Sequence, residues 1–247
     1  MDPILELEGV WAAYPGGRGA ALRGASLSLP PGELGLLVGP NGAGKTTILE
    51  VLLGFVTYRG RARAFGLEVR DHRAEIRRRV GYLPQELFFP PDAPCRAIDL
   101  VLMGRFGQFR PWQRLPKGEH ERALSALSRF GLVERADWPI GHLSGGQQRK
   151  ALLARALAKG AELLLLDEPF ASLDPQARLD LAQAILGLKD EGLTILAVVH
   201  EEELLSRADR AFLVREGKSQ PLPQGLVRSS SKTHLAEIWE GVRTCWP

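Results

Sequence analysis

The sequence predicts an α/β fold with a mainly parallel sheet, an N-terminal antiparallel β region and an inserted helical region. Three observations support this prediction. An apolar segment at 33–39 leads through a glycine-rich loop into residues 45–54, whose apolar side chains recur at helical spacing. Two further apolar segments, 162–167 and 194–200, alternate with helix-like segments. Continuous apolar strands that alternate with helices are typical of a parallel sheet with both faces covered.

The remaining elements follow in chain order. Strand-like and turn-like stretches alternate from Ile4 to about Gly66, which predicts a β region packed against the core. Residues 69–79 are rich in charge and have a helical rhythm, and they lead into an apolar strand at 80–84.

The chain changes in character between about Gln85 and Leu143, where prolines are frequent and continuous β-like segments are few. Residues 120–132 carry apolar side chains at helical spacing, so we predict a mostly helical region. After it we expect a helix that Gly160 ends, a strand at 162–167, a helix near 175–188 and a strand at 194–200. The predicted organisation is one domain over residues 1–247: a core from 1–85 and 156–220, a helical region at 86–155 and a C-terminal tail at 221–247.

The composition favours an intracellular protein that is not a nucleic-acid binder. The 247 residues are 45% hydrophobic, and 32 basic against 29 acidic residues give a net charge of only +3. Cys95 and Cys245 are too few for a disulfide framework, which agrees with a reducing compartment. No signal peptide is evident, and the apolar segments fall far short of the roughly 20 residues that a spanning helix needs. Any work at a membrane is therefore expected to go through a partner.

The glycine-rich loop reads GPNGAGKT and matches the phosphate-binding pattern GxxxxGK[ST]. Such a loop directs backbone N–H groups and a helix dipole at polyphosphate. Lys45 supplies a cation for the β- and γ-phosphates, and Thr46 supplies a hydroxyl for Mg²⁺. A chance glycine-rich turn is the alternative, but the flanking strand and helix disfavour it. The predicted nucleotide-binding residues here are Gly39, Pro40, Asn41, Gly42, Ala43, Gly44, Lys45, Thr46 and Thr47.

Two carboxylates, Asp167 and Glu168, end the apolar strand LLLLDE. Phosphoryl transfer requires mainly position and charge compensation. We therefore assign Asp167 to Mg²⁺ and Glu168 to the attacking water. Acids that simply mark the end of a strand are the alternative, which the phosphate loop in the same predicted sheet makes less favourable.

GPNGAGKT, GYLPQ, LSGGQQRKALLARAL, LLLLDEPFASLD and AVVH occur in the order found in ATP-binding cassette (ABC) transporters. From about Ile4 to Gly217 the chain resembles their nucleotide-binding subunit. The resemblance implies an ATPase that uses ATP and Mg²⁺ and pairs head to tail with a second copy of itself. ATP would then lie between the phosphate loop of one copy and the LSGGQ segment of the other. The residues implied to touch nucleotide in trans are Ser144, Gly145, Gly146 and Gln147.

The resemblance also assigns single residues. Gln85 matches the glutamine that senses Mg²⁺ and the water, and His200 matches the switch histidine at the γ-phosphate. Tyr14 matches the aromatic that stacks on adenine, although a ring this near the N-terminus could equally be edge packing. Residues 172–174 match the loop that crosses the dimer interface. Glu201 replaces the usual aspartate after the histidine.

Residues 99–108, with the pair Gly104 and Arg105, most resemble importers of metal cations of the zinc and manganese type. Iron-chelate and cobalamin importers share the pair and are the alternative, and a soluble non-transport ABC ATPase is a more distant one. The implied partners are polytopic permease subunits and an extracytoplasmic substrate-binding protein, with the chain peripheral at the cytoplasmic face of the membrane.

Apolar residues that follow Gln85 closely, after Glu86, are well placed to receive a permease helix. We predict docking for this group, which is Leu87, Phe88 and Phe89. For Met103 and Phe106, ordinary helix packing is as good an interpretation as docking.

Overall fold

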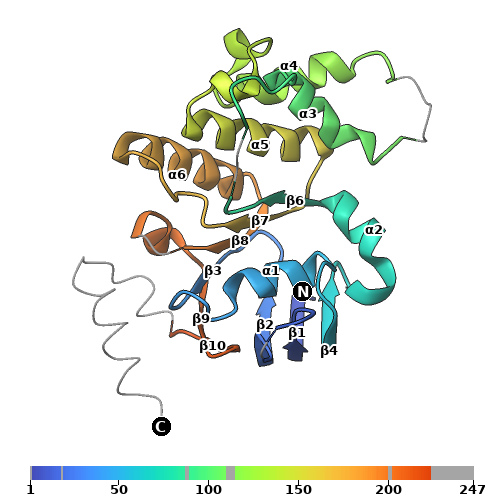
Figure 1. The fold of residues 1–247 in the computed structure, drawn as a ribbon, viewed down its shortest axis with the longest axis vertical. Helices are drawn as coiled ribbons and strands as arrows, with labels where there is room; N and C mark the ends of the chain where they lie inside the picture. Colours follow the sequence, from blue (N-terminus) through green and yellow to red (C-terminus); the bar gives the residue numbers. More distant parts are fainter. Residues whose placement is uncertain (1, 18, 87–88, 110–114, 200–201, 224–247) are drawn as a thin grey trace.

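The computed structural model describes residues 2–17, 19–86, 89–109, 115–199 and 202–223 (Figure 1). Three layers follow one another along the long axis. Helices α3, α4 and α5 lie at one end, the central sheet lies in the middle, and strands β1, β2 and β4 lie at the other end. None of the described helices is long and apolar enough to cross a bilayer.

The strands are β1 (Leu5–Ala12), β2 (Leu22–Leu29), β3 (Leu34–Val38), β4 (Tyr58–Ala64), β5 (Leu67–Glu68), β6 (Val80–Leu83), β7 (Leu163–Asp167), β8 (Thr194–Val198), β9 (Arg210–Arg215) and β10 (Lys218–Pro221). The α-helices are α1 (Lys45–Leu52), α2 (Val69–Arg79), α3 (Ala97–Phe106), α4 (Glu119–Ser128), α5 (Gly145–Lys159) and α6 (Pro175–Asp190). Short 3-10 helices cover Val133–Arg135, Ile140–His142 and Glu202–Arg207.

The central sheet has the strand order β10-β9-β3-β8-β7-β6. Its pairs β3–β8, β3–β9, β6–β7 and β7–β8 are parallel, and β10 alone pairs antiparallel, with β9. Every residue of β3, β7 and β8 is buried, as expected for parallel strands covered on both faces. The predicted α/β core is therefore confirmed.

The antiparallel β region is confirmed as a second sheet, with the order β2-β1-β4-β5. Helix α1 lies between this sheet and the central one (Figure 1). Leu49 of α1 shares a core cluster with Leu7 of β1 and with Leu163 and Leu165 of β7. The phosphate-loop helix is thus held between two sheets.

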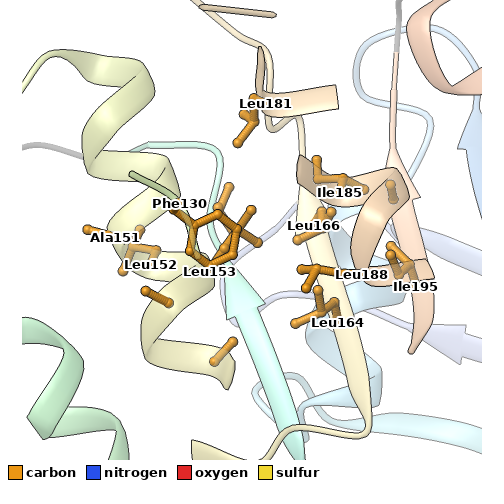
Figure 2. Packing of buried hydrophobic residues seen from close by; sticks show 14 of the residues in the cluster. Phe130, Ala151, Leu152, Leu153, Leu164, Leu166, Leu181, Ile185, Leu188 and Ile195 are labelled. Carbon is orange, nitrogen blue, oxygen red and sulfur yellow. The ribbon is translucent and has the colours of Figure 1, made fainter. Parts of the chain in front are cut away.

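The opposite face of the central sheet packs against α5 and α6 (Figure 2). Leu164 and Leu166 of β7 point to this side because successive side chains of a strand alternate between its faces. The same cluster continues into α3 and α4, so the helical region shares its core with the central sheet. The boundary predicted between residues 155 and 156 falls inside α5, which continues unbroken to Lys159. Most of the predicted tail, residues 224–247, lies outside the described residues.

The helical region contains a buried ion pair between Arg105 and Glu119. The Arg105 Nε and Nη2 atoms donate to the two carboxylate oxygens of Glu119, at 2.5 and 3.0 Å. These hydrogen bonds lower the pKa of Glu119 more than burial raises it. Gly104 has its own packing role, because a Cβ atom there would lie 2.6 Å from the carbonyl oxygen of Arg155. The Gly104 and Arg105 pair therefore has a structural reason that is independent of cargo.

We expect Glu119→Gln to lower the free energy of unfolding by about 2 kcal/mol or more, because Arg105 keeps a buried charge without its counter-ion. Denaturant unfolding measures this loss. The exposed Glu121→Gln on the same helix is the matched control and should stay within about 0.5 kcal/mol of the wild type. Arg105→Met combined with Glu119→Leu should recover much of the lost stability, because it removes both charges. Equal losses in Glu119→Gln and Glu121→Gln would contradict this interpretation.

Candidate active site

The phosphate loop joins the end of β3 to the start of α1, as predicted. Gly44 is the N-cap of α1 and has a left-handed backbone, with φ of 106°. A Cβ atom on this residue would lie 2.7 Å from the carbonyl oxygen of Ala21, so both the backbone angle and the space require glycine. The loop and the first turn of α1 thus present backbone N–H groups at a helix N-terminus, which suits a polyphosphate.

Lys45 lies at the centre of this loop with only 5% of its surface exposed. Its Nζ atom donates to the carbonyl oxygens of Gly39 at 2.8 Å and Pro40 at 2.9 Å. Burial lowers the pKa of Lys45, and the charges of Glu168 and Asp167 act in the opposite direction. A phosphate oxygen is a stronger acceptor for this ammonium group than a carbonyl oxygen, because the acceptor is charged.

Asp167 and Thr46 form the part of the site that suits a divalent cation. Asp167 is the last residue of β7 and is 1% exposed, and it accepts a hydrogen bond from the Thr46 hydroxyl at 3.2 Å. Burial raises the pKa of Asp167, so a cation beside it would stabilise the charged form. Mg²⁺ prefers such oxygen ligands and completes its shell with water and phosphate oxygens.

Glu168 follows Asp167 with a left-handed backbone, at φ of 45°. Its backbone N–H donates to the Val198 carbonyl oxygen at 3.1 Å, which fixes the turn at the end of the sheet. Non-glycine residues in this region carry strain, and such strain is common at functional sites. Gln85 Nε2 donates to Glu168 Oε2 at 2.9 Å. The structure therefore joins the two residues predicted to handle water.

These groups surround one cavity of ≈ 390 Å³. Its lining combines the phosphate loop with residues from three distant parts of the chain. A larger hollow of ≈ 770 Å³ lies beside Trp11 and Arg59, but none of its described lining residues carries a carboxylate. The kinds of residue in the lining, and not the volume, therefore identify the site. The residues of the smaller cavity are Tyr14, Ala21, Asn41, Gly42, Gly44, Lys45, Thr46, Thr47, Gln85 and Glu168.

Tyr14 lines this cavity, although 41% of its surface is exposed. Its hydroxyl group bonds to Thr47 Oγ1 at 3.0 Å and donates to the carboxylate of Glu50, and both partners belong to α1. Burial is the main reason that the pKa of Tyr14 is raised, and Glu50 adds to it. The ring is thus anchored beside the phosphate loop. Glu50 was missed in the sequence because it looks like an ordinary polar position of an amphipathic helix.

The LSGGQ segment starts α5, with Ser144 as N-cap. The Ser144 N–H donates to Gln147 Oε1 at 3.1 Å, and Ser144 Oγ accepts from the Gln147 N–H at 3.4 Å. This capping box satisfies orphan donors at the helix start. Among the described residues that line the nucleotide cavity, none comes from 144–147. His200 and Glu201 lie outside the described residues, so the roles predicted for them remain predictions.

Residues 22–171 match the family profile described as ABC transporter. The chain belongs to the ABC transporter family. It is 38% identical over 202 residues to the manganese transport system ATP-binding protein MntB of Bacillus subtilis, covering 81% of this chain and 78% of that protein. It is 37% identical over 188 residues to the zinc transport system ATP-binding protein TroB of Treponema pallidum, covering 75% and 69%. The dimeric ABC transporter cassette MJ0796 has a similar fold, with a TM-score of 0.77, 26% identity and coverage of 89% and 99%.

The cassette links its LSGGQ helix to the loop that follows Glu168. Arg149 of α5 is buried and donates from Nη2 to the carbonyl oxygen of Ala171 at 2.7 Å. Ser172 in this loop has a left-handed backbone, with φ of 60°. Asp174 then caps α6 by accepting from the Ala177 N–H at 2.9 Å. Arg149 was missed because a single sequence gives no sign that a cation on the apolar face of a helix reaches a distant carbonyl.

We expect Arg149→Ala to lower the free energy of unfolding by about 1–3 kcal/mol, because it leaves the Ala171 carbonyl unpaired beside a cavity. Lys150→Ala is the matched control. Lys150 is partly exposed, and its ion pair with Asp180 spans 3.5 Å at the surface, so its loss should cost less than about 1 kcal/mol. Thermal unfolding of the two variants compares them directly. A cost for Arg149→Ala no larger than that for Lys150→Ala would refute the role of Arg149.

Proposed function

We propose that this cassette is the ATP-hydrolysing subunit of a membrane importer for metal cations of the manganese and zinc type. The observation that carries the chemistry is the single cavity that unites Lys45, Thr46, Gln85 and Glu168 beside Asp167. The cargo class rests on the relatives named for manganese and zinc transport. A cassette of an iron-chelate or cobalamin importer is the second candidate, because the Gly104 and Arg105 pair fits that branch equally well.

The proposed hydrolysis assigns a task to each group. The phosphate loop and Lys45 bind and orient the β- and γ-phosphates. Thr46 and Asp167 would hold Mg²⁺, and the bound ion would compensate negative charge during phosphoryl transfer. Glu168 orients the attacking water and accepts its proton. Gln85 keeps the Glu168 carboxylate in place through their 2.9 Å hydrogen bond. Tyr14 offers its ring to the base, and His200 is assigned to the γ-phosphate.

We propose that the active unit is a head-to-tail pair of cassettes. Ser144 and Gly145 are exposed at the start of α5 and lie outside the nucleotide cavity of their own chain, as far as its lining is described. The N–H groups of a helix start suit an anion, so the phosphates bound by a second copy are a fitting target. The dimeric state of the similar cassette MJ0796 supports this arrangement.

The proposed permease contact is a groove of ≈ 390 Å³ between the central sheet and the helical region. Phe55, Tyr82 and Phe89 line it, and Phe55 is 55% exposed. Of the three residues predicted to dock, Leu87 and Phe88 lie outside the described residues. Phe89 lines the groove and also packs against the core cluster, so it can serve both purposes. Binding there would hold the chain at the cytoplasmic face of the membrane, and a substrate-binding protein would deliver the cargo on the other side.

Reconstitution tests this proposal. The full chain is expressed with the polytopic protein encoded beside its gene, the complex is purified and placed in liposomes, and uptake of Mn²⁺ and Zn²⁺ is followed with ATP inside or outside. We expect uptake that depends on ATP on the side of the cassette and that stops with Glu168→Gln. Uptake of an iron chelate or cobalamin with no uptake of either metal ion would favour the second candidate. Failure to isolate any complex with a polytopic protein would refute the transport function.

A further inference from the structure

The charged side chains that line the permease groove all have the same sign. Three of its lining residues are basic, namely Arg77, Arg155 and Lys159, and none of its described lining residues is acidic. The other lining residues are apolar, aromatic or small. Low-dielectric walls lined by one sign of charge concentrate the electric field, so such a groove attracts an anionic group.

Arg155 is the groove cation whose side chain bonds to no other described residue. It lies on α5, its side chain is exposed to the groove, and Gly104 packs against the Arg155 Cγ atom and carbonyl oxygen. Within the described part of the chain, Arg155 has no hydrogen-bond acceptor and no carboxylate at ion-pair distance. Desolvation by the surrounding protein lowers its pKa, and no opposing charge offsets this effect. Its guanidinium thus carries up to five donors toward the groove.

The other two cations are already engaged. Lys159 Nζ donates to the backbone carbonyl oxygens of Val80, at 2.7 Å, and of Arg77, and so closes the end of α2. Burial lowers the pKa of Lys159 to about 8, with a further contribution from Arg155. The Arg77 Nε atom donates to the Arg73 carbonyl oxygen at 3.2 Å, and its guanidinium lies 5.5 Å from the centre of the Phe55 ring. Both therefore add positive potential, while Arg155 offers the free donor set.

We propose that this groove binds a permease helix that presents a carboxylate to Arg155 and apolar side chains to Phe55, Tyr82 and Phe89. The inference rests on the proposed transport function and adds the chemistry of the partner segment. A guanidinium binds a carboxylate through two parallel N–H donors. Such a pair contributes binding energy and also fixes the orientation of the bound helix. The aromatic lining favours a helix with apolar neighbours over a free anion, which would leave those rings exposed to water.

The test compares Arg155→Glu with Arg78→Glu in the full chain, against the detergent-solubilised permease that co-purifies with the wild type. Arg78 makes the same charge change from an exposed position next to Arg77 on α2, outside the groove lining. Arg155→Glu should weaken binding about thirtyfold or more, whereas Arg78→Glu should change it only a few-fold. Arg155→Gln, a milder change, should weaken binding and reduce its dependence on NaCl. Melting curves report whether each variant is folded.

Substitutions in the permease provide the decisive experiment, because they leave the structure of this chain unchanged. Each Asp and Glu in the cytoplasmic loops of the permease is changed to Lys in turn. One such variant should weaken binding to the wild-type cassette and restore binding to Arg155→Glu. Normal binding by Arg155→Glu would overturn the carboxylate contact while leaving the transport function intact, and so would the absence of any restoring variant. If the wild-type chain bound no polytopic protein, the transport function itself would fail and this inference with it.

Discussion

Glu168→Gln is expected to keep ATP affinity near that of the wild type while lowering turnover about 100-fold or more, the loss typical of a missing general base. The amide has the shape of the carboxylate but cannot accept a proton from water. The 2.9 Å bond from Gln85 and the left-handed backbone of Glu168 both fix the carboxylate at the cavity. Steady-state hydrolysis and a separate nucleotide-binding titration measure the two effects.

Glu162→Gln is the matched control for this experiment. Glu162 directly precedes β7, at the opposite end from Glu168, and pairs at the surface with Arg79 at 2.6 Å. Its substitution removes the same charge and should leave turnover within about twofold of the wild type. Undiminished hydrolysis by Glu168→Gln would remove this residue from the chemical step. A matching loss of ATP binding would instead assign it to holding nucleotide.

A mixture of Lys45→Ala and Ser144→Arg chains should hydrolyse ATP, although each variant alone is almost inactive. Lys45→Ala removes the buried cation of the phosphate loop, and Ser144→Arg places a large side chain where the start of α5 is exposed. A head-to-tail heterodimer combines one intact loop with one intact LSGGQ segment. Random mixing then restores up to about a quarter of the wild-type sites, because half of the dimers carry one intact site of two.

Ser144→Ala separates the effect of bulk from the loss of the helix cap. It removes the hydroxyl that accepts from Gln147, at a typical cost of about 1 kcal/mol in stability, but it leaves the surface open. It should therefore retain much more hydrolysis than Ser144→Arg. A mixture no more active than its parents, with both chains folded and associated, would contradict the shared site.

The sequence allowed prediction of those parts of the site that short segments determine. The strand, loop and helix at 33–54 depend on neighbouring residues, which is why their pattern could be recognised. The role of Gln85 was expected only from the family resemblance, and its hydrogen bond to Glu168 is seen only in the structure. The contact of Tyr14 with Glu50 and that of Arg149 with Ala171 depend on how separate elements pack, which a local pattern does not encode. The sequence marked Arg105 only through its resemblance to the importer branch, and its buried ion pair with Glu119 likewise depends on how two helices pack.

Helix α5 makes the two ends of the cassette mechanically one piece. Its 15 residues span about 22 Å at 1.5 Å per residue, from the cap at Ser144 to Lys159 at the groove. Neither glycine nor proline interrupts it after Gly146, and its buried leucines clamp it against the central sheet. A helix of this kind is stiff, so Arg149 and Arg155, which both belong to it, are expected to move together. We therefore expect a displacement of the LSGGQ segment to move the groove residues of α5 with it, because no break in the helix lies between them.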